Sequence, residues 1–428
     1  MRLEQAGVAR DSLQIAWDFT TASMENNTRA LLHMRDDALG MYAEGEGPSF
    51  TITNVDSDYE PDTIAYRIEG TIEVPLYLDQ PGAGARLVHG PDGLPEQQGT
   101  AEYPFIALIP QSALMEPAPL LQYGHGLLGG HGEVQASHLR TFLNEYNYIA
   151  FSVDWIGMAD EDAIYIATML VNGSMHDFEG VTDRLHQGVL NFLLASRMMR
   201  TGFAEDEAFG PYVDPDNVYY LGISQGGIFG GTYMALTQDV LRGCVGVPGQ
   251  PYNLLLNRSV DFDQYFALLV PGYDDSRDLQ ILLALLQMLW DQAEPTGYSY
   301  KVSDNMFPNT PEHQLLIRAA VGDHQVTTLG APHRLAGVGA PHLDTGIREI
   351  WGLDVASGSN EGSTYVEYSF GLPMDPIGNV PQEACEDPHG KLRRLEEARM
   401  QLDTFFKTGV VENYCMDGVC DFPDMSGC

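Results

Sequence analysis

Short apolar runs alternate with helical stretches over most of the chain after residue 103. The runs are β-prone, and helical periodicity separates several of them, most clearly over residues 182–199. This alternation predicts a mostly parallel sheet with helices on both faces, because parallel strands need crossover connections. Ligand sites in such sheets lie at the carboxyl ends of the strands. The predicted strands are 105–109, 120–123, 148–153, 218–223, 244–247 and 315–320.

The first hundred residues have a different pattern, with strand-like alternation at 13–20 and 63–78. A short helix is predicted over residues 28–39. Residues 80–100 are rich in Gly and Pro and are expected to form a loop. The pattern therefore predicts a β-rich N-terminal region, residues 1–100, in front of the α/β core.

The predicted α/β core occupies residues 101–249 and 313–410 and is interrupted by an insertion at 250–312. The insertion contains a strongly apolar helix over 276–290, with Ser276 as its expected N-cap. Such a helix is either a lid over the functional site or an ordinary packing helix. The sequence pattern is compatible with both.

The charge balance narrows the classes of partner. The chain has 60 acidic and 22 basic residues, which gives a formal net charge of -38. This charge disfavours binding to nucleic acid or to an anionic membrane surface. No apolar run approaches the ~18 residues that a membrane-spanning helix needs. The sequence contains no zinc-ligand spacing and no calcium-binding loop, so we expect neither a metal nor another cofactor.

The cysteines point to an oxidising compartment. Cys385 and a tail at residues 411–428 contain four of the five cysteines, and this clustering in a loop-rich segment favours disulfides over reduced thiols. Cys244, on a predicted buried strand, is expected to stay a free thiol. Residues 1–5 lack the apolar core of a signal peptide. We therefore expect a secreted, periplasmic or cell-surface protein whose leader has been removed. The expected partner of Cys385 is Cys415, Cys420 or Cys428.

Residues 222–226 read GISQG and lie between a predicted strand and a predicted helix. A G-x-S-x-G sequence in this position forms a nucleophile elbow, a tight turn that presents a serine hydroxyl at the sheet edge. The serine backbone is strained, and side chains two positions to either side would clash with neighbouring backbone. Ser224 is therefore the candidate nucleophile.

A serine nucleophile needs a base and a group that orients the base. Asp323 lies in the turn after the strand predicted at 315–320, and His389 lies in the loop between a predicted strand, 365–370, and an amphipathic helix, 391–406. These two residues are the candidate acid and base. Rival bases are His324, His333 and His342, and rival acids are Asp344, Asp354 and Asp375.

A glycine-rich loop, residues 123–130, follows an early predicted strand and supplies backbone N–H groups. A phosphate-binding loop is the alternative, but no G-x-x-x-x-G-K-[ST] sequence is present. Backbone donors aimed at a developing oxyanion contribute about 3 kcal/mol each.

Together, the segments 124–126, 222–226, 322–323 and 387–390 resemble the α/β-hydrolase-fold serine esterases and lipases, in particular bacterial carboxylesterases. The resemblance covers about residues 103–408 and implies the α/β-hydrolase fold, with the chain order Ser, acid, His. It implies a triad of Ser224, Asp323 and His389. The implied oxyanion donors are the N–H groups of Leu127 and Gln225, supported by Gly124, His125 and Gly126, with His125 organising the loop.

The resemblance implies hydrolysis of carboxylic esters through an acyl-enzyme, with a small-molecule or lipid-like ester as substrate. A lipase or polyester depolymerase of the same fold is one alternative, which the apolar helix in the insertion motivates. A non-catalytic binding protein on a hydrolase scaffold is another, because fold does not imply function.

Overall fold

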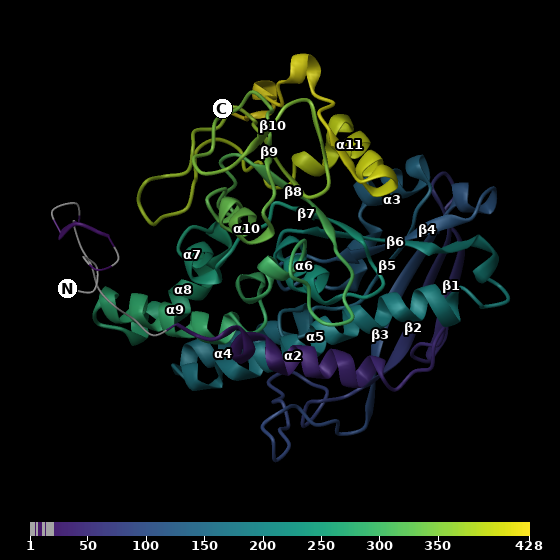
Figure 1. Ribbon diagram of the computed structural model, residues 1–428. Coiled ribbons are helices and arrows are strands. Elements are labelled where there is room, and N and C mark those ends of the chain that lie inside the picture. Colours follow the sequence, from purple (N-terminus) through teal and green to yellow (C-terminus); the bar gives the residue numbers. More distant parts are fainter. Residues whose placement is uncertain (1–4, 6, 11–12, 14–20) are drawn as a thin grey trace.

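The computed structural model describes residues 5, 7–10, 13 and 21–428. Its centre is an 11-stranded sheet in the order β1-β2-β3-β5-β4-β6-β7-β8-β12-β9-β10 (Figure 1). The strands are β1 (Phe50–Glu60), β2 (Ile64–Pro75), β3 (Thr100–Pro110), β4 (Ala118–Gly124), β5 (Ile149–Ser152), β6 (Val213–Ile223), β7 (Arg242–Gly246), β8 (Gln314–Ala320), β9 (His342–Leu343), β10 (Val355–Ala356) and β12 (Thr364–Tyr368). A second, two-stranded sheet pairs β11 (Ser359–Glu361) with β13 (Val410–Glu412).

The sheet is antiparallel at one end and parallel elsewhere. β1, β2, β3 and β5 pair antiparallel in succession. From β5 through β4, β6, β7, β8, β12 and β9 to β10, every pairing is parallel. This confirms the predicted α/β-hydrolase fold class, a mostly parallel sheet whose carboxyl edge collects the loops after β4, β6, β8 and β12.

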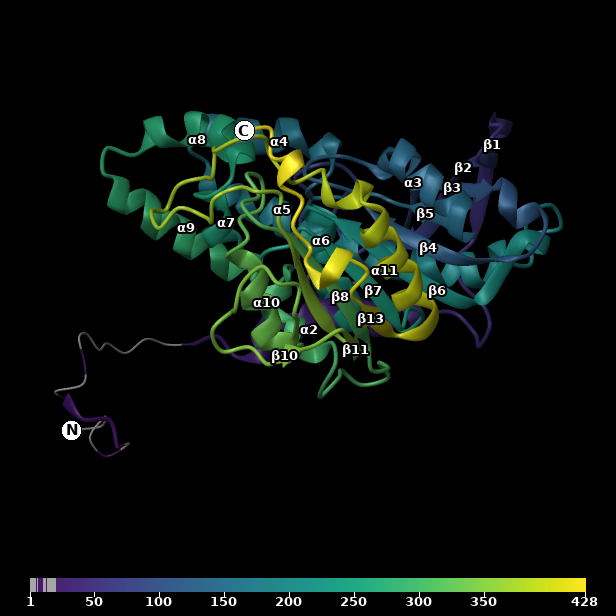
Figure 2. The same cartoon turned by 90° about the horizontal axis from the view of Figure 1, so that it is seen from above.

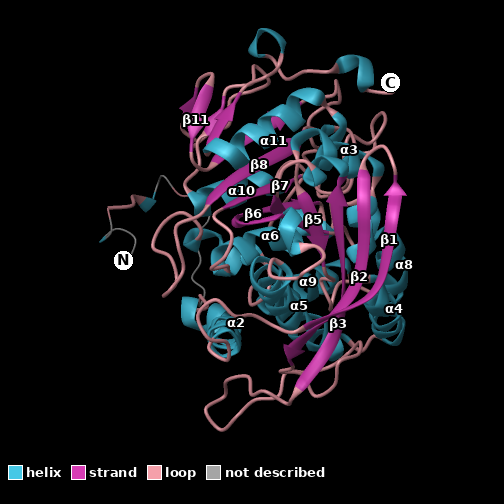
Figure 3. Cartoon of the chain, turned by 90° about the vertical axis from the view of Figure 1, so that its right-hand side faces the viewer, coloured by secondary structure: helices cyan, strands magenta, loops and turns pink. Residues whose placement is uncertain are grey.

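Helices cover both faces of the sheet, and each face has its own apolar core (Figure 3). One core contains residues of α2, α5 and α6, and the other contains residues of α3 and α11. The strands between them are buried on both faces, as expected for parallel strands. The helices are α2 (Met24–Leu39), α3 (Ser137–Tyr146), α4 (Ala163–Asn172), α5 (Glu179–Met198), α6 (Gln225–Leu236), α7 (Tyr252–Leu256), α8 (Asp263–Leu269), α9 (Ser276–Trp290), α10 (Gly330–Val338) and α11 (Glu396–Thr408).

β1 and β2, which come from the predicted N-terminal region, continue the main sheet. β2 corresponds to the strand predicted at 63–78 and pairs with β3 along its whole length. The predicted helix at 28–39 is part of α2, whose first turn is capped by the Ser23 hydroxyl accepting from the Asn26 N–H at 3.1 Å. The strand predicted at 13–20 lies outside the described residues, apart from residue 13. Nothing therefore separates residues 50–75 from the α/β sheet.

Two details of the predicted helices are wrong. Asp275, not Ser276, caps α9: its carboxylate accepts from the Arg277 N–H at 2.9 Å, and a carboxylate satisfies an N-terminal amide as a hydroxyl would. The helix predicted at 391–406 is broken, because Leu395 has an extended backbone (ψ 136°) and is buried in the core. A short 3-10 turn, Leu392–Arg394, precedes Leu395, and α11 follows it.

The insertion folds as α7, α8 and α9, which lie together at one side of the molecule, away from β1 and β2 (Figure 2). Over the part of the chain that the structure describes, no helix has both the length and the apolarity needed to span a bilayer. The helix predicted within the insertion is confirmed as α9, and its role as a movable lid stays a prediction.

Candidate active site

Ser224 lies in a sharp turn between β6 and α6, at the carboxyl edge of the sheet. Its backbone has φ 60° and ψ -123°, a conformation that is strained for a residue with a side chain. Two hydrogen bonds hold it: the Ser224 N–H donates to the Gly246 carbonyl of β7 at 3.0 Å, and the Ser224 carbonyl accepts from the Ile228 N–H at 2.9 Å. The elbow geometry predicted for residues 222–226 is therefore present.

The glycines of the elbow are required by close backbone approach. A Cβ on Gly222 would overlap the Gly226 carbonyl, and a Cβ on Gly226 would overlap the Gly124 carbonyl of β4. The Tyr220 hydroxyl donates to the Gly226 carbonyl at 2.6 Å and fixes the start of α6 against β6. The turn can thus bring the serine to the sheet edge only with glycine at both positions.

Asp323 and His389 meet across the site although they are 66 residues apart in the chain. Nδ1 of His389 lies 2.8 Å from Oδ2 and 3.0 Å from Oδ1 of Asp323, and both side chains are almost fully buried. Oδ1 of Asp323 also accepts from the N–H groups of Gln325 and Val326, each at 2.9 Å. These backbone donors fix the carboxylate, so it can hold the imidazole in one orientation.

The environment of His389 favours its protonated form. Burial lowers the pKa of this imidazole, but the charge of the Asp323 carboxylate and the hydrogen bond to it together outweigh burial, and the pKa of His389 is raised above its ordinary value. Nδ1 is thus the ring nitrogen that the Asp323 carboxylate contacts.

Asp387 supports the base through the backbone, a role that sequence analysis missed. Its Oδ1 accepts from the N–H of His389 at 3.0 Å and of His324 at 3.2 Å, and its Oδ2 accepts from Nε2 of Gln325 at 2.7 Å. Burial raises the pKa of Asp387, yet these hydrogen bonds and the nearby His389 lower it overall. The Asp-Pro-His sequence contained the signal, since Asp before Pro starts Asx turns.

Ser224 and His389 line one polar cavity of about 480 Å³. Three segments outside the predicted site also line this cavity. They are the insertion, the η3 turn (His131–Gln135) and the turn before α11. Burial raises the pKa of Asp261 in this wall, and the His389 imidazole opposes that shift. The lining residues are Tyr123, Gly126, Leu127, Leu128, Glu133, Ile223, Ser224, Asp261, Gln264, Tyr265, Gln325, His389, Gly390 and Arg393.

The glycine-rich loop after β4 is held next to the elbow. His125 is fully buried: its Nε2 accepts from the Trp155 N–H at 2.7 Å, so its Nδ1 carries the proton and donates to the Gly126 carbonyl at 2.9 Å. Burial lowers the pKa of His125, which agrees with this neutral form. Nε2 of Gln225 donates to the carbonyls of Gly126, at 3.3 Å, and Met158, at 2.9 Å. The residue after the serine thus ties loop and elbow together.

The N–H groups that sequence analysis proposed as oxyanion donors lie at this junction. Among the described residues, the N–H of Leu127 and the N–H of Gln225 have no hydrogen-bond partner. Gln225 is the first residue of α6, where the helix cannot satisfy its own N–H groups. The N–H of Gly126 is taken by the Glu133 carboxylate at 2.9 Å, a contact that sequence analysis missed. The Gly126 amide is therefore engaged within the loop.

The other histidines and aspartates considered as base or acid lie outside the polar cavity or have other hydrogen-bond partners. Nε2 of His324 lies 3.1 Å from the Ala384 carbonyl, and Asp375 accepts from Oγ1 of Thr327 at 2.9 Å. His342 packs against the Tyr365 ring on β12. His333 lies on α10, with its side chain outside the described residues. None of the rivals, His324, His333, His342, Asp344, Asp354 and Asp375, is among the described residues lining the polar cavity.

The predicted disulfide at the loop that carries His389 is confirmed. Cys385, four residues before His389, pairs with Cys428, and Cys415 pairs with Cys420. Cys244 is a buried free thiol, as expected. The Glu386 N–H also donates to the Ser426 carbonyl at 3.0 Å, so the end of the tail is fastened to the loop by both covalent and hydrogen bonds.

Comparison with known proteins gives only distant structural likeness. No protein-family model matches the chain, and no curated protein sequence matches it. Acetyl xylan esterase 1 from Thermoanaerobacterium sp. JW/SL YS485 is 13% identical over 83% of this chain and 95% of that chain, with a TM-score of 0.40. An S-formylglutathione hydrolase from Agrobacterium tumefaciens is 12% identical (84% and 98% covered, TM-score 0.40). An acetyl xylan esterase from Paenibacillus sp. R4 is 11% identical (90% and 99% covered, TM-score 0.43).

We predict that His389 titrates above the ordinary histidine value of about 6.5 and that Asp323→Asn lowers its pKa below that value. Removing the carboxylate charge leaves burial as the dominant influence, and burial disfavours the imidazolium. Proton NMR of the imidazole, assigned with a His389→Gln variant, measures both values. Asp344→Asn, outside the cavity, is the control and leaves the titration unchanged. An unaltered His389 pKa in Asp323→Asn contradicts the assignment.

We predict that the two disulfides differ in their contribution to stability. Chain-entropy arguments give about 4 kcal/mol for the Cys385–Cys428 loop and about 2 kcal/mol for the Cys415–Cys420 loop, since the sequence separations are 43 and 5. Denaturant unfolding of the two paired Cys→Ser variants measures the difference. The expectation fails if removing the Cys385–Cys428 bond costs no more than removing the short one.

Proposed function

We propose that this protein is a serine hydrolase that cleaves carboxylic esters through an acyl-enzyme. One observation supports this most strongly: Ser224 on its strained elbow and His389, paired with a buried Asp323, line the same cavity. A nucleophile, a base and an orienting carboxylate in one buried site are the set that activated serine chemistry needs. The N–H groups of Leu127 and Gln225, which have no partner among the described residues, complete it.

In the proposed reaction, Oγ of Ser224 attacks the ester carbonyl while Nε2 of His389 takes the hydroxyl proton. The imidazolium that forms is stabilised by Asp323, which itself stays ionised. The tetrahedral intermediate then breaks its bond to the alcohol oxygen, which leaves with the proton from His389. Water attacks the acyl-enzyme, gives its proton to Nε2 and releases the acid, and that proton returns to Ser224.

The negative oxygen of the tetrahedral intermediate is proposed to accept from the N–H groups of Leu127 and Gln225. Donors of this kind are effective because they are already oriented before charge develops, and each contributes about 3 kcal/mol. The side chain of Gln225 adds to this orientation, since its bonds to the Gly126 and Met158 carbonyls hold the two donors at a fixed separation.

A lipase or polyester depolymerase is the second candidate, and the outer face of α9 favours it. Ile281, Leu285 and Met288 are each more than half exposed and recur at helical spacing, so α9 presents an apolar stripe to solvent. The opposite face of α9 is buried. An exposed stripe of this kind on the insertion suits contact with an emulsion droplet or a polymer film.

The two disulfides support the expected location in an oxidising compartment, that is, a secreted, periplasmic or cell-surface protein. The net charge of -38 fits neutral substrates better than anionic ones, because the field of the whole chain repels anions.

We predict that Ser224→Ala and His389→Gln each lower the hydrolysis of p-nitrophenyl acetate by about 10⁴-fold or more while leaving the protein folded, because each removes one member of the acting unit. His176→Gln, an exposed histidine outside the cavity, is the matched control and keeps full activity. A fluorophosphonate probe labels Ser224 in the wild type. A folded wild type that neither hydrolyses esters nor takes the label would show a binding protein instead.

We predict that replacing Ile281, Leu285 and Met288 together by Ser lowers the rate on tributyrin emulsions several-fold and leaves the rate on dissolved p-nitrophenyl acetate unchanged. The stripe acts only where an interface is present. Rates measured below and above the solubility limit of the triglyceride test this. Equal loss on both substrates points to misfolding, and no loss on either removes the lipase candidate.

A further inference from the structure

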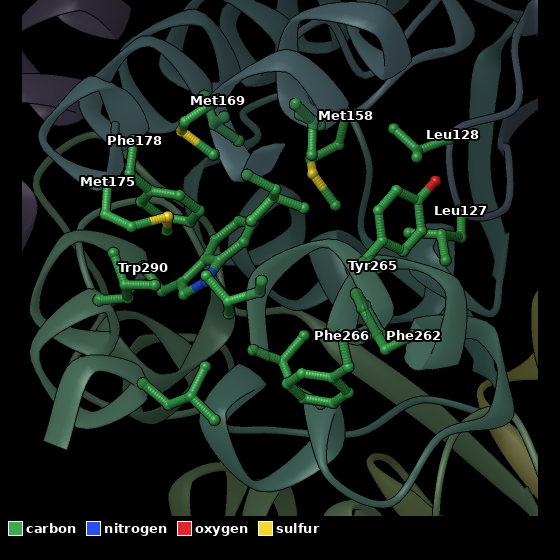
Figure 4. A pocket seen from close by; sticks show the side chains of 17 residues that line it. Leu127, Leu128, Met158, Met169, Met175, Phe178, Phe262, Tyr265, Phe266 and Trp290 are labelled. Carbon is green, nitrogen blue, oxygen red and sulfur yellow. The ribbon is translucent and has the colours of Figure 1, made fainter. Parts of the chain in front are cut away.

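A second cavity adjoins the polar one and is apolar throughout (Figure 4). Its volume is about 80 Å³, and it is lined by 17 Leu, Ile, Val, Met and aromatic side chains. Helices α7, α8 and α9 of the insertion supply part of the wall, and α4 and α5 supply part of the rest. Cavities of this kind hold apolar groups, because they offer water no hydrogen-bond partner.

The two cavities meet at Leu127, Leu128 and Tyr265, which line both of them. Figure 4 shows these three residues at one end of the apolar cavity and Met175, Phe178 and Trp290 at the other. Leu127 is also the residue whose N–H is the proposed oxyanion donor. When the ester's carbonyl oxygen accepts from this N–H, a group attached to the carbonyl carbon is therefore next to the apolar cavity.

The orientation of an ester follows from which residues border only one cavity. His389, Gly390 and Arg393 line the polar cavity and are not among the lining residues of the apolar one. The alcohol oxygen must face His389, because it takes the proton from that residue. The acyl chain therefore extends the other way, past Leu127, and the alcohol lies against polar side chains such as Gln325 and Arg393.

The far end of the apolar cavity is rigid and its side wall is adaptable. The Trp290 ring is stacked on Tyr252 with centroids 4.2 Å apart and packs edge-on against Phe178 at 5.1 Å. Met158, Met169 and Met175 line the cavity, and methionine adjusts easily to the shape of a bound group. Such a cavity tolerates variation in width but limits length.

We propose that the natural substrates are esters of a medium-length acyl chain and a polar alcohol. The inference rests on the proposed function and names its substrate class. A group the size of a water molecule or a methylene needs roughly 10–15 Å³ of such a cavity, so the apolar cavity holds about six of them. Together with the carbons that lie in the polar cavity, this corresponds to acyl chains of roughly six to eight carbons.

The first test is a series of p-nitrophenyl esters from acetate to dodecanoate. We expect kcat/KM to rise roughly fourfold for each added methylene, as burial of one methylene gives, up to about six to eight carbons and then to fall. A flat series, or a maximum at acetate, overturns the inference and leaves the proposed ester hydrolysis intact.

A matched pair on α4 ties the chain-length preference to this cavity. Ile166 lines the cavity, whereas Ile164, two residues earlier, is exposed on the same helix. Ile166→Trp fills the cavity and should move the maximum to acetate or butanoate, and Ile166→Ala should move it to longer chains. Ile164→Trp should leave the profile as in the wild type. A maximum that stays in place in both Ile166 variants contradicts the assignment.

Binding to Ser224→Ala separates the inference from the proposed function. Calorimetry with p-nitrophenyl hexanoate and p-nitrophenyl acetate should show about 10-fold or more tighter binding of the hexanoate, lost in Ser224→Ala/Ile166→Trp. Tighter hexanoate binding in a protein whose wild type hydrolyses no ester keeps the cavity assignment and rejects the hydrolase. Equal binding of the two esters rejects the cavity assignment, whatever the wild type hydrolyses.

Discussion

The close approach of three backbone segments at Ser224 is the constraint on which the rest of the site depends. β4, β6 and the start of α6 come so near one another that Gly222 and Gly226 leave no room for a Cβ, and the Tyr220 hydroxyl occupies that space at Gly124. This approach forces the left-handed backbone of the serine and puts the free amide of Gln225 beside the loop after β4. Strain of this kind costs about 1–3 kcal/mol and persists only where the surrounding structure determines it. Buried parallel strands on both sides supply that support.

The loop that carries His389 is held by a different principle, since residues 371–391 follow β12 but lie outside any helix or strand. Hydrogen bonds and a covalent link do this instead. Asp387 accepts from the backbone of His389, Asp323 accepts from its ring, and the Cys385–Cys428 disulfide fastens the loop to the chain terminus. Ser224 is thus positioned by packing and His389 by polar contacts, which suits a ring that would change charge in the proposed reaction.

The sequence predicted parts of the candidate site where the backbone geometry allows only one type of residue. The elbow could be predicted because only glycine permits its backbone contacts, and Asp323 and His389 could be predicted because each follows a recognisable strand. Asp261 and Glu133 could not, because they reach the cavity by tertiary folding of the insertion and of a short turn. The break at Leu395 was missed because its apolar spacing matched a helix, while burial of that side chain in the core favoured an extended residue.

In the proposed enzyme, the sheet and the insertion have different tasks. The sheet positions the reacting groups, and the insertion shapes the space for the substrate. The groups proposed to make and break bonds come from loops at the carboxyl edge of the sheet. The insertion contributes none of them, yet it supplies Asp261 and Tyr265 to the polar cavity and much of the wall of the apolar one. Tyr265 borders both cavities, so a shift of α8 would alter the entrance for the acyl chain without moving Ser224 or His389. Changes in the insertion are therefore expected to alter which ester the proposed enzyme accepts, while the strained elbow at Ser224 stays as the sheet requires.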